Sequence, residues 1–193
     1  YIKDNFNLGL ICRKYNFYES AWNEEQGCYV STGNYNTYDA LRHVSHTLKQ
    51  ILNFVEDRRI DYYIYKNAPG YQGYYTALYD KYFHSRVIDK ALQSDEKTSQ
   101  DLDSYMFRLI NITNSNRNLR ALPGLMKIWK TLDLKNIDRL KTTADALDVA
   151  TKVFNIIESN LTVPEKQEEK SGGDNDNEMS ESSGNNNGSS DES

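Results

Sequence analysis

The sequence predicts a helix-rich α+β domain, in which a small antiparallel sheet precedes a helical C-terminal half. Three observations indicate this class. Apolar residues recur at helical spacing in several segments, short β-branched and aromatic runs occur in the first third, and the last 29 residues show neither pattern. The expected order is strand, strand, helix, strand, followed by helices. We expect one domain over residues 1–164, with a β-containing part at 1–93 and a helical part at 101–161.

The first two predicted elements are strands of a hairpin. Residues 8–18 alternate apolar and polar side chains, as Leu8, Leu10 and Cys12 illustrate. A polar connection that ends at Gly27 leads to a second short strand at 28–32. The sequence therefore predicts an antiparallel pair near the N-terminus.

The strongest helical pattern follows at about residues 37–57. Its apolar residues are spaced three, four, three and four apart: Leu41, Val44, Leu48, Ile51 and Val55. Thr37 suits the N-cap, and Asp39 suits the first turn, where the helix dipole favours an acid. Residues 60–65 are aromatic and β-branched, so we expect a third strand there.

The rest of the domain is predicted to be helical. Helical spacing covers residues 74–83 and 87–92, and a polar linker follows at 94–100. We expect further helices at 102–112, from Pro123 to 132, and at 134–160, with Pro164 ending the last one.

Charge is distributed unevenly along the chain. The net charge is −5, but residues 165–193 alone carry −7, so residues 1–164 carry +2. The tail is rich in Asn, Ser and Gly and has no aromatic residue, so it cannot bury enough apolar surface to fold, and we expect it to be disordered. No apolar run approaches the ~18 residues of a membrane span, which excludes that class of protein.

Tyrosine is the one compositional surplus. Seven of the fifteen tyrosines lie between residues 62 and 79. Tyrosine offers rigid contact area with a polar tip, which is typical of recognition surfaces. We therefore expect a non-enzymatic interaction or assembly protein that binds a protein partner or itself through Tyr71, Tyr74, Tyr75, Tyr79 and Tyr82.

A nucleic-acid-binding protein is the alternative. The most basic stretch of the chain includes Arg117, Arg120, Lys127, Lys130 and Lys135. The acidic tail could cover such a patch and compete with phosphates. A charge of only +2 outside the tail favours a solvated helical face instead.

A metal-dependent enzyme is the third hypothesis. Asp39, His43 and His46 share one side of the strongest helix and are residue types that bind zinc. A solvated helix face is the simpler interpretation of this spacing. No nucleophile elbow, phosphate loop or metalloprotease helix is present, so a non-enzyme without a cofactor is favoured.

Cysteine use and targeting patterns favour the cytoplasm or a virion over secretion. Cys12 and Cys28 do not fall opposite each other in the predicted hairpin, which favours two reduced thiols over a disulfide. No signal-peptide pattern is present, and we expect no membrane partner.

Residues 32–84 resemble a pattern in small uncharacterised proteins of bacteriophages and Bacteroidota. The resemblance rests on a Thr32-Gly-Asn34 turn, an amphipathic helix, a strand at 61–65 and the pair Leu78-Tyr79. In those proteins an Arg-x-x-Leu-Tyr motif opens the next helix, whereas this chain has Tyr75 in place of the arginine. The resemblance implies a phage-linked origin, such as a virion or accessory protein, and no known activity.

Overall fold

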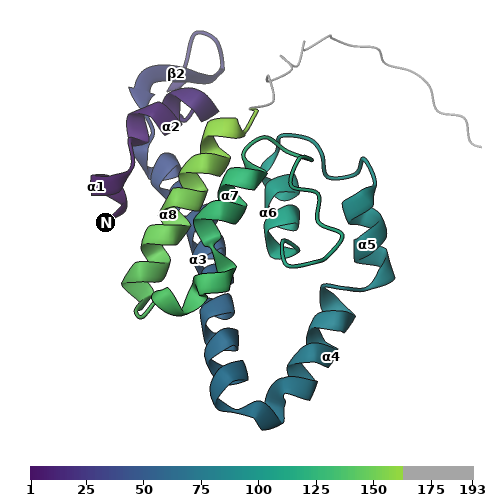
Figure 1. The fold of residues 1–193 in the computed structure, drawn as a ribbon. Coiled ribbons are helices and arrows are strands. Elements are labelled where there is room, and N and C mark those ends of the chain that lie inside the picture. The colour runs from purple at the N-terminus through teal and green to yellow at the C-terminus, as the bar shows by residue number, and fades with distance from the viewer. Residues whose placement is uncertain (163–193) are drawn as a thin grey trace, which may run out of the picture. The chain divides into compact units, whose positions relative to one another are not determined.

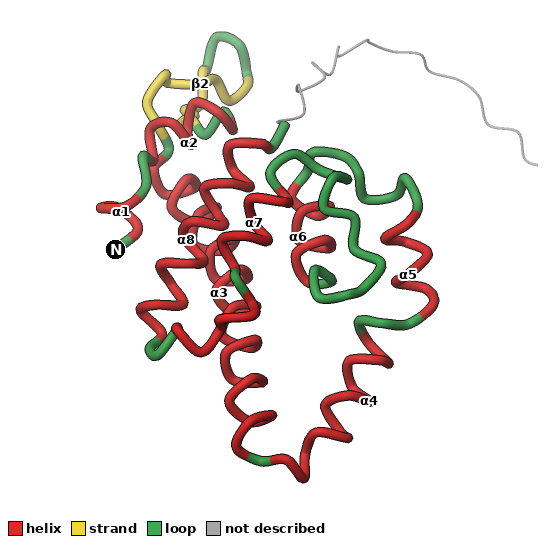
Figure 2. Tube along the Cα trace, in the orientation of Figure 1, coloured by secondary structure: helices red, strands yellow, loops and turns green. Residues whose placement is uncertain are grey.

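The fold consists of two short N-terminal helices, a two-stranded antiparallel sheet and a larger set of helices that follows it, as Figures 1 and 2 show. The computed structural model describes residues 1–162, and Tyr1–Val163 form one compact unit. The predicted helix-rich α+β class is confirmed. The predicted tail at 165–193 lies outside the described residues.

The elements follow one another with short connections. The N-terminal part contains α1 (Ile2–Asn5), α2 (Leu8–Tyr15), β1 (Tyr18–Asn23), β2 (Cys28–Tyr35) and α3 (Thr37–Asn67). The middle contains the 3₁₀ turn η1 (Pro69–Tyr71), α4 (Gln72–Tyr82), α5 (Arg86–Gln93) and α6 (Leu102–Ile110). The chain continues with α7 (Leu125–Leu132), the 3₁₀ segment η2 (Leu134–Arg139) and α8 (Thr143–Asn160).

The prediction of a strand at 8–18 is wrong, because most of this segment is helix α2. The Asn7 side chain caps the helix by accepting a hydrogen bond from the Leu10 amide at 3.1 Å, and Asn16 ends it in a left-handed conformation at φ 54°. The segment contains, besides its alternation of polar and apolar residues, a second apolar pattern with helical spacing. Its members face the core: Leu8, Ile11, Cys12 and Tyr15.

The prediction of a third strand at 60–65 is also wrong, because α3 continues through these residues to Asn67. No glycine or proline occurs between residue 37 and Pro69, so nothing interrupts a helix that is already nucleated. Arg58 and Asp61, three positions apart, form an ion pair of 3.1 Å across this part of the helix. The sheet therefore has two strands, and the strand assumed in the resemblance is helical.

The last predicted helix is divided. Residues 134–139 form the 3₁₀ segment η2, and α8 begins only at Thr143. Thr142 and Asp145 form a capping box, in which each side chain accepts a hydrogen bond from the other residue's backbone amide. This cap fixes the start of α8 nine residues later than the apolar pattern alone predicts.

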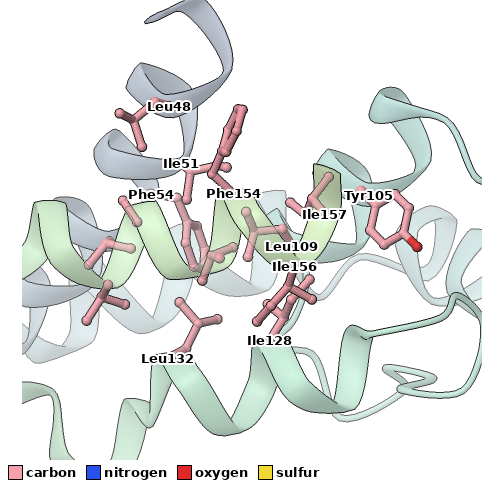
Figure 3. Packing of buried hydrophobic residues seen from close by; sticks show 14 of the residues in the cluster. Leu48, Ile51, Phe54, Tyr105, Leu109, Ile128, Leu132, Phe154, Ile156 and Ile157 are labelled. Carbon is pink, nitrogen blue, oxygen red and sulfur yellow. The ribbon is translucent and has the colours of Figure 1, made fainter. Parts of the chain in front are cut away.

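One hydrophobic core joins α3, α6, α7 and α8. The view in Figure 3 shows side chains of these four helices meeting: Leu48, Ile51, Phe54, Tyr105, Leu109, Ile128, Leu132, Phe154, Ile156 and Ile157. The buried part of α3 ends at Val55, and no residue of α4 is buried. The distal half of α3 and all of α4 therefore extend beyond the core, as Figure 1 shows.

Gly124 allows α7 to approach α8 closely. It precedes α7 with φ +81°, and a Cβ there would lie 2.9 Å from the Ile156 side chain. A larger residue would have to displace the side chains of Ile156 and Asn160 on α8.

None of the helices in residues 1–162 combines the length and apolar character required to cross a membrane.

Candidate functional site

The tyrosines of the predicted interaction surface gather on the part of α3, η1 and α4 that lies outside the core. Tyr71, Tyr74 and Tyr82 are 60%, 76% and 55% exposed. Together with Leu78 they recur at helical spacing from the end of η1 along one side of α4, and we call these four residues the outer row. Their exposure makes them the accessible part of the predicted surface.

Tyr75 and Tyr79 have a different position from the other three predicted residues. They are half-buried and face a pocket of about 380 Å³ between α3 and α4. Tyr62 and Tyr65 line the same pocket from α3, and Leu134 and Ile137 line it from η2. We call this hollow the tyrosine pocket. Its volume lies within the range of about 300–1,000 Å³ that is usual for binding pockets.

Arg58 holds the two walls of the pocket together. Its guanidinium lies 4.8 Å from the Tyr79 ring centre, 5.4 Å from that of Phe54 and 5.7 Å from that of Phe83. Its Nη2 lies 3.1 Å from Asp61 Oδ2, while the buried Nε and Nη1 have no hydrogen-bond partner among the described residues. The three rings therefore replace hydrogen-bond acceptors around this cation.

Tyr79 completes the link between α3 and α4. Its hydroxyl donates a hydrogen bond to Asp61 Oδ2, the same oxygen that pairs with Arg58. Burial, and then the hydrogen bond to Asp61, raise the pKa of the Tyr79 phenol, so it stays protonated and remains a donor. Tyr79 is thus a wall of the pocket rather than a freely exposed contact residue.

The five basic residues of the nucleic-acid alternative do not form a uniform group. Arg117 stacks on the Trp129 ring at 4.4 Å and donates to the Asn114 carbonyl oxygen at 3.0 Å. Arg120, Lys127, Lys130 and Lys135 are exposed. Arg117 is therefore engaged within the fold, and four bases are left on the surface.

The three metal candidates are each engaged with a different neighbour. Asp39 accepts a hydrogen bond from the Asn36 side chain at 2.8 Å. His43 Nε2 lies 3.5 Å from Glu158 Oε2, and His46 Nε2 lies 3.2 Å from the Gln50 amide nitrogen. Within residues 1–162, no three His, Cys, Asp or Glu side chains lie close enough to hold a metal ion. Cys12 and Cys28 are both free thiols, the first buried and the second exposed.

A partly buried polar cluster around Glu158 was not found by sequence reasoning. Glu158 Oε1 lies 3.0 Å from the Lys14 ammonium, and the Tyr15 hydroxyl donates to Glu158 Oε2 at 3.1 Å. His43 completes the cluster, and its ring centre lies 4.4 Å from that of Tyr15. The residues come from α2, α3 and α8, so no local pattern could have brought them together.

The environment of Glu158 favours its charged form. Burial alone would raise the pKa of Glu158, but hydrogen bonds from His43, Lys14 and Tyr15 outweigh burial and hold the pKa below its ordinary value. The carboxylate therefore stabilises the contact of α2 and α3 with the end of α8.

We expect Glu158→Gln to lower the free energy of unfolding by about 2 kcal/mol at neutral pH, because the partly buried Lys14 ammonium loses its counter-charge. The folded-state pKa of Glu158 is depressed, so its contribution is fully present above the unfolded value of about 4.3 and is lost as the pH falls through the folded value. Urea unfolding at a series of pH values should show that the difference in unfolding free energy between wild type and variant becomes smaller in acid.

Asp148→Asn serves as the control for this prediction. Asp148 pairs with Lys152 on the surface, where both side chains are more than half exposed. An exposed pair of this kind contributes less than about 1 kcal/mol. If the difference in unfolding free energy between wild type and Glu158→Gln stays constant down to the lowest pH, the charged Glu158 carboxylate does not have the proposed stabilising role.

Comparison with known proteins gives no relative: the chain matches no protein-family model, no curated protein and no solved structure.

Proposed function

We propose that the protein is a non-enzymatic assembly protein whose tyrosine-rich surface binds a second copy of the same chain. The observation that carries this proposal is that η1 and α4 together hold an exposed ridge, the outer row, while α4 also forms one wall of the tyrosine pocket. In a two-fold interface both subunits use the same patch, so one patch must carry both complementary parts. The outer row and the tyrosine pocket meet that requirement, because a ridge and a hollow that both present tyrosines lie side by side on each copy.

The charge of this region permits self-association. Residues 56–86 contain five basic and four acidic side chains. Two of the pairs are internal, Arg58 with Asp61 and Arg59 with Glu56. Two copies of a nearly neutral patch repel each other little when they meet.

The exposed area of the region is close to what an interface needs. The exposed tyrosines on or beside the pocket and outer row have exposed fractions from 36% to 76%: Tyr62, Tyr65, Tyr71, Tyr74 and Tyr82. At about 200 Å² for each fully exposed aromatic side chain, they present roughly 550 Å². A standard interface buries about 800 Å² per partner, so the tyrosines alone supply most of it. An assembly role also fits the phage-linked origin that the resemblance implies, which stays a prediction.

Replacing Tyr71 and Tyr74 by serine is expected to weaken self-association at least tenfold, because aromatic residues at the centre of an interface carry much of its energy. Sedimentation velocity over a range of protein concentrations measures the association constant. The thermal midpoint should change little, since both side chains are mostly exposed.

Tyr38→Ser is the matched control for Tyr74→Ser. Tyr38 is 72% exposed and Tyr74 is 76% exposed. Tyr38, however, lies at the N-terminal end of α3, whereas Tyr74 lies on α4, beyond the C-terminal end of α3. An equal effect of the two substitutions, or a wild-type protein that stays monomeric at every concentration, would contradict the proposal.

A further inference from the structure

A second surface, separate from α3 and α4, is formed by the hairpin of β1 and β2. The strands pair in antiparallel fashion with Ala21 opposite Val30 and Trp22 opposite Tyr29. Nearly every hairpin side chain is exposed on both faces of the sheet. Within residues 1–162 no third strand joins the sheet, so each strand keeps one free edge.

All charged side chains of the hairpin are acidic. Between Lys14 and Arg42 the chain contains no base, and the hairpin itself carries Glu19, Glu24 and Glu25. All three glutamates are exposed, and none forms an ion pair with another described residue. A hairpin with several acids and no base attracts a basic partner and repels an acidic one.

An exposed aromatic pair lies in the same hairpin, where Trp22 comes two residues before Glu24. Trp22 is 55% exposed and Tyr29 is 71% exposed, and their ring centres lie 5.3 Å apart at an interplanar angle of 72°. Aromatic faces next to carboxylates bind Arg and Lys side chains through cation–π contacts. The protein already uses this contact internally, where Arg117 stacks on Trp129.

The protection of the hairpin edges is limited to the irregularity between Tyr18 and Ser20 and to the exposed glutamates. Natural edge strands are commonly guarded by lysine or proline, and residues 18–35 contain neither. Free backbone groups on an exposed edge can pair with an extended segment of another protein. The occupant that this edge admits is therefore an extended peptide segment.

We infer that the hairpin is a docking site for an extended, basic segment of a partner protein. Arg or Lys side chains of the segment stack on Trp22 and Tyr29 and pair with the three glutamates, while its backbone hydrogen-bonds to a free strand edge. The site lies outside the surface proposed for self-association (Figure 1). The protein would then link a basic partner to its own assembly.

The two tryptophans of the chain allow a direct test with the full-length ¹⁵N-labelled protein. Trp22 and Trp129 give two indole N–H signals, which Trp22→Phe assigns. The probe is an eight-residue peptide of alternating lysine and valine, and the control peptide replaces lysine by glutamate. The basic peptide is expected to shift the Trp22 signal and leave the Trp129 signal in place, while the acidic peptide shifts neither.

Charge-neutral variants locate the binding site. Glu19→Gln, Glu24→Gln and Glu25→Gln combined should weaken binding at least tenfold. The matched control neutralises three exposed acids elsewhere, Asp95→Asn, Glu96→Gln and Asp103→Asn, and should change binding less than twofold.

The acidic residues 165–193 are present in both variants, so any binding to them is the same in each. Equal weakening in the two variants, or a basic peptide that leaves the Trp22 signal unmoved, would overturn the inference. Tyr71→Ser with Tyr74→Ser should bind the peptide as the wild type does, which separates this inference from the proposed self-association.

Discussion

Replacing Arg108 by methionine is expected to lower the free energy of unfolding by about 3 kcal/mol. Arg108 is 3% exposed and donates hydrogen bonds to three carbonyl oxygens of the segment before α6, at Leu92, Glu96 and Lys97. Methionine preserves most of the aliphatic volume but leaves the three oxygens without these donors. For a chain of this size the thermal midpoint should fall by roughly 6–12 °C.

Arg120→Met is the control for Arg108→Met. Arg120 is exposed, and its side chain forms no hydrogen bond with another described residue. Its substitution should therefore change the free energy of unfolding by less than about 0.5 kcal/mol. Two variants of equal stability would show that Arg108 does not hold the segment before α6.

Replacing Arg58 by methionine is expected to release α4 from α3. The substitution removes the ion pair with Asp61 and the cation–π contacts with Phe54, Tyr79 and Phe83. Because no residue of α4 is buried, α4 depends on a few polar and aromatic contacts with α3, and the contact of Arg58 with the Tyr79 ring is one of them. The hydrogen bond from Tyr79 to Asp61 remains in the variant but loses the neighbouring cation. Amide hydrogen exchange in α4 should accelerate at least tenfold, and self-association should weaken as the pocket opens.

Arg59→Met provides the comparison for Arg58→Met. Arg59 is the next residue on α3 and pairs with Glu56 at 2.6 Å, but it does not line the tyrosine pocket. Arg59→Met should therefore leave amide hydrogen exchange in α4 almost unchanged. The same acceleration in both variants would assign the effect to α3 in general rather than to the Arg58 contacts.

The fold class and the core of α3 could be predicted from the sequence, because burial imposes a regular spacing on Val44, Leu48, Ile51 and Val55. The two wrong strands have a common cause. The β propensity of a short segment stabilises it less than the contacts that its helical form makes. In α2 these are the core contacts of Ile11 and Cys12, and in α3 the ion pair of Arg58 with Asp61.

The candidate site could be predicted only in part. The tyrosine surplus in the composition led to Tyr71, Tyr74 and Tyr82, which are exposed as a recognition surface requires. The pocket could not be predicted, because it depends on the pairing of Arg58 in α3 with Tyr79 in α4. The Glu158 cluster could not be predicted for the same reason, since Glu158 contacts Tyr15 and His43, which are more than 100 positions away in the sequence.

Hydrogen–deuterium exchange of the wild-type protein at low and at high protein concentration tests the proposed self-association most directly. If two copies meet through the tyrosine-rich surface, the distal half of α3 and α4 should become more protected as the concentration rises. The hairpin and α8 should exchange at the same rate at both concentrations. Protection that does not depend on concentration, or that increases in another part of residues 1–162 while α4 stays unchanged, would contradict the proposed assembly.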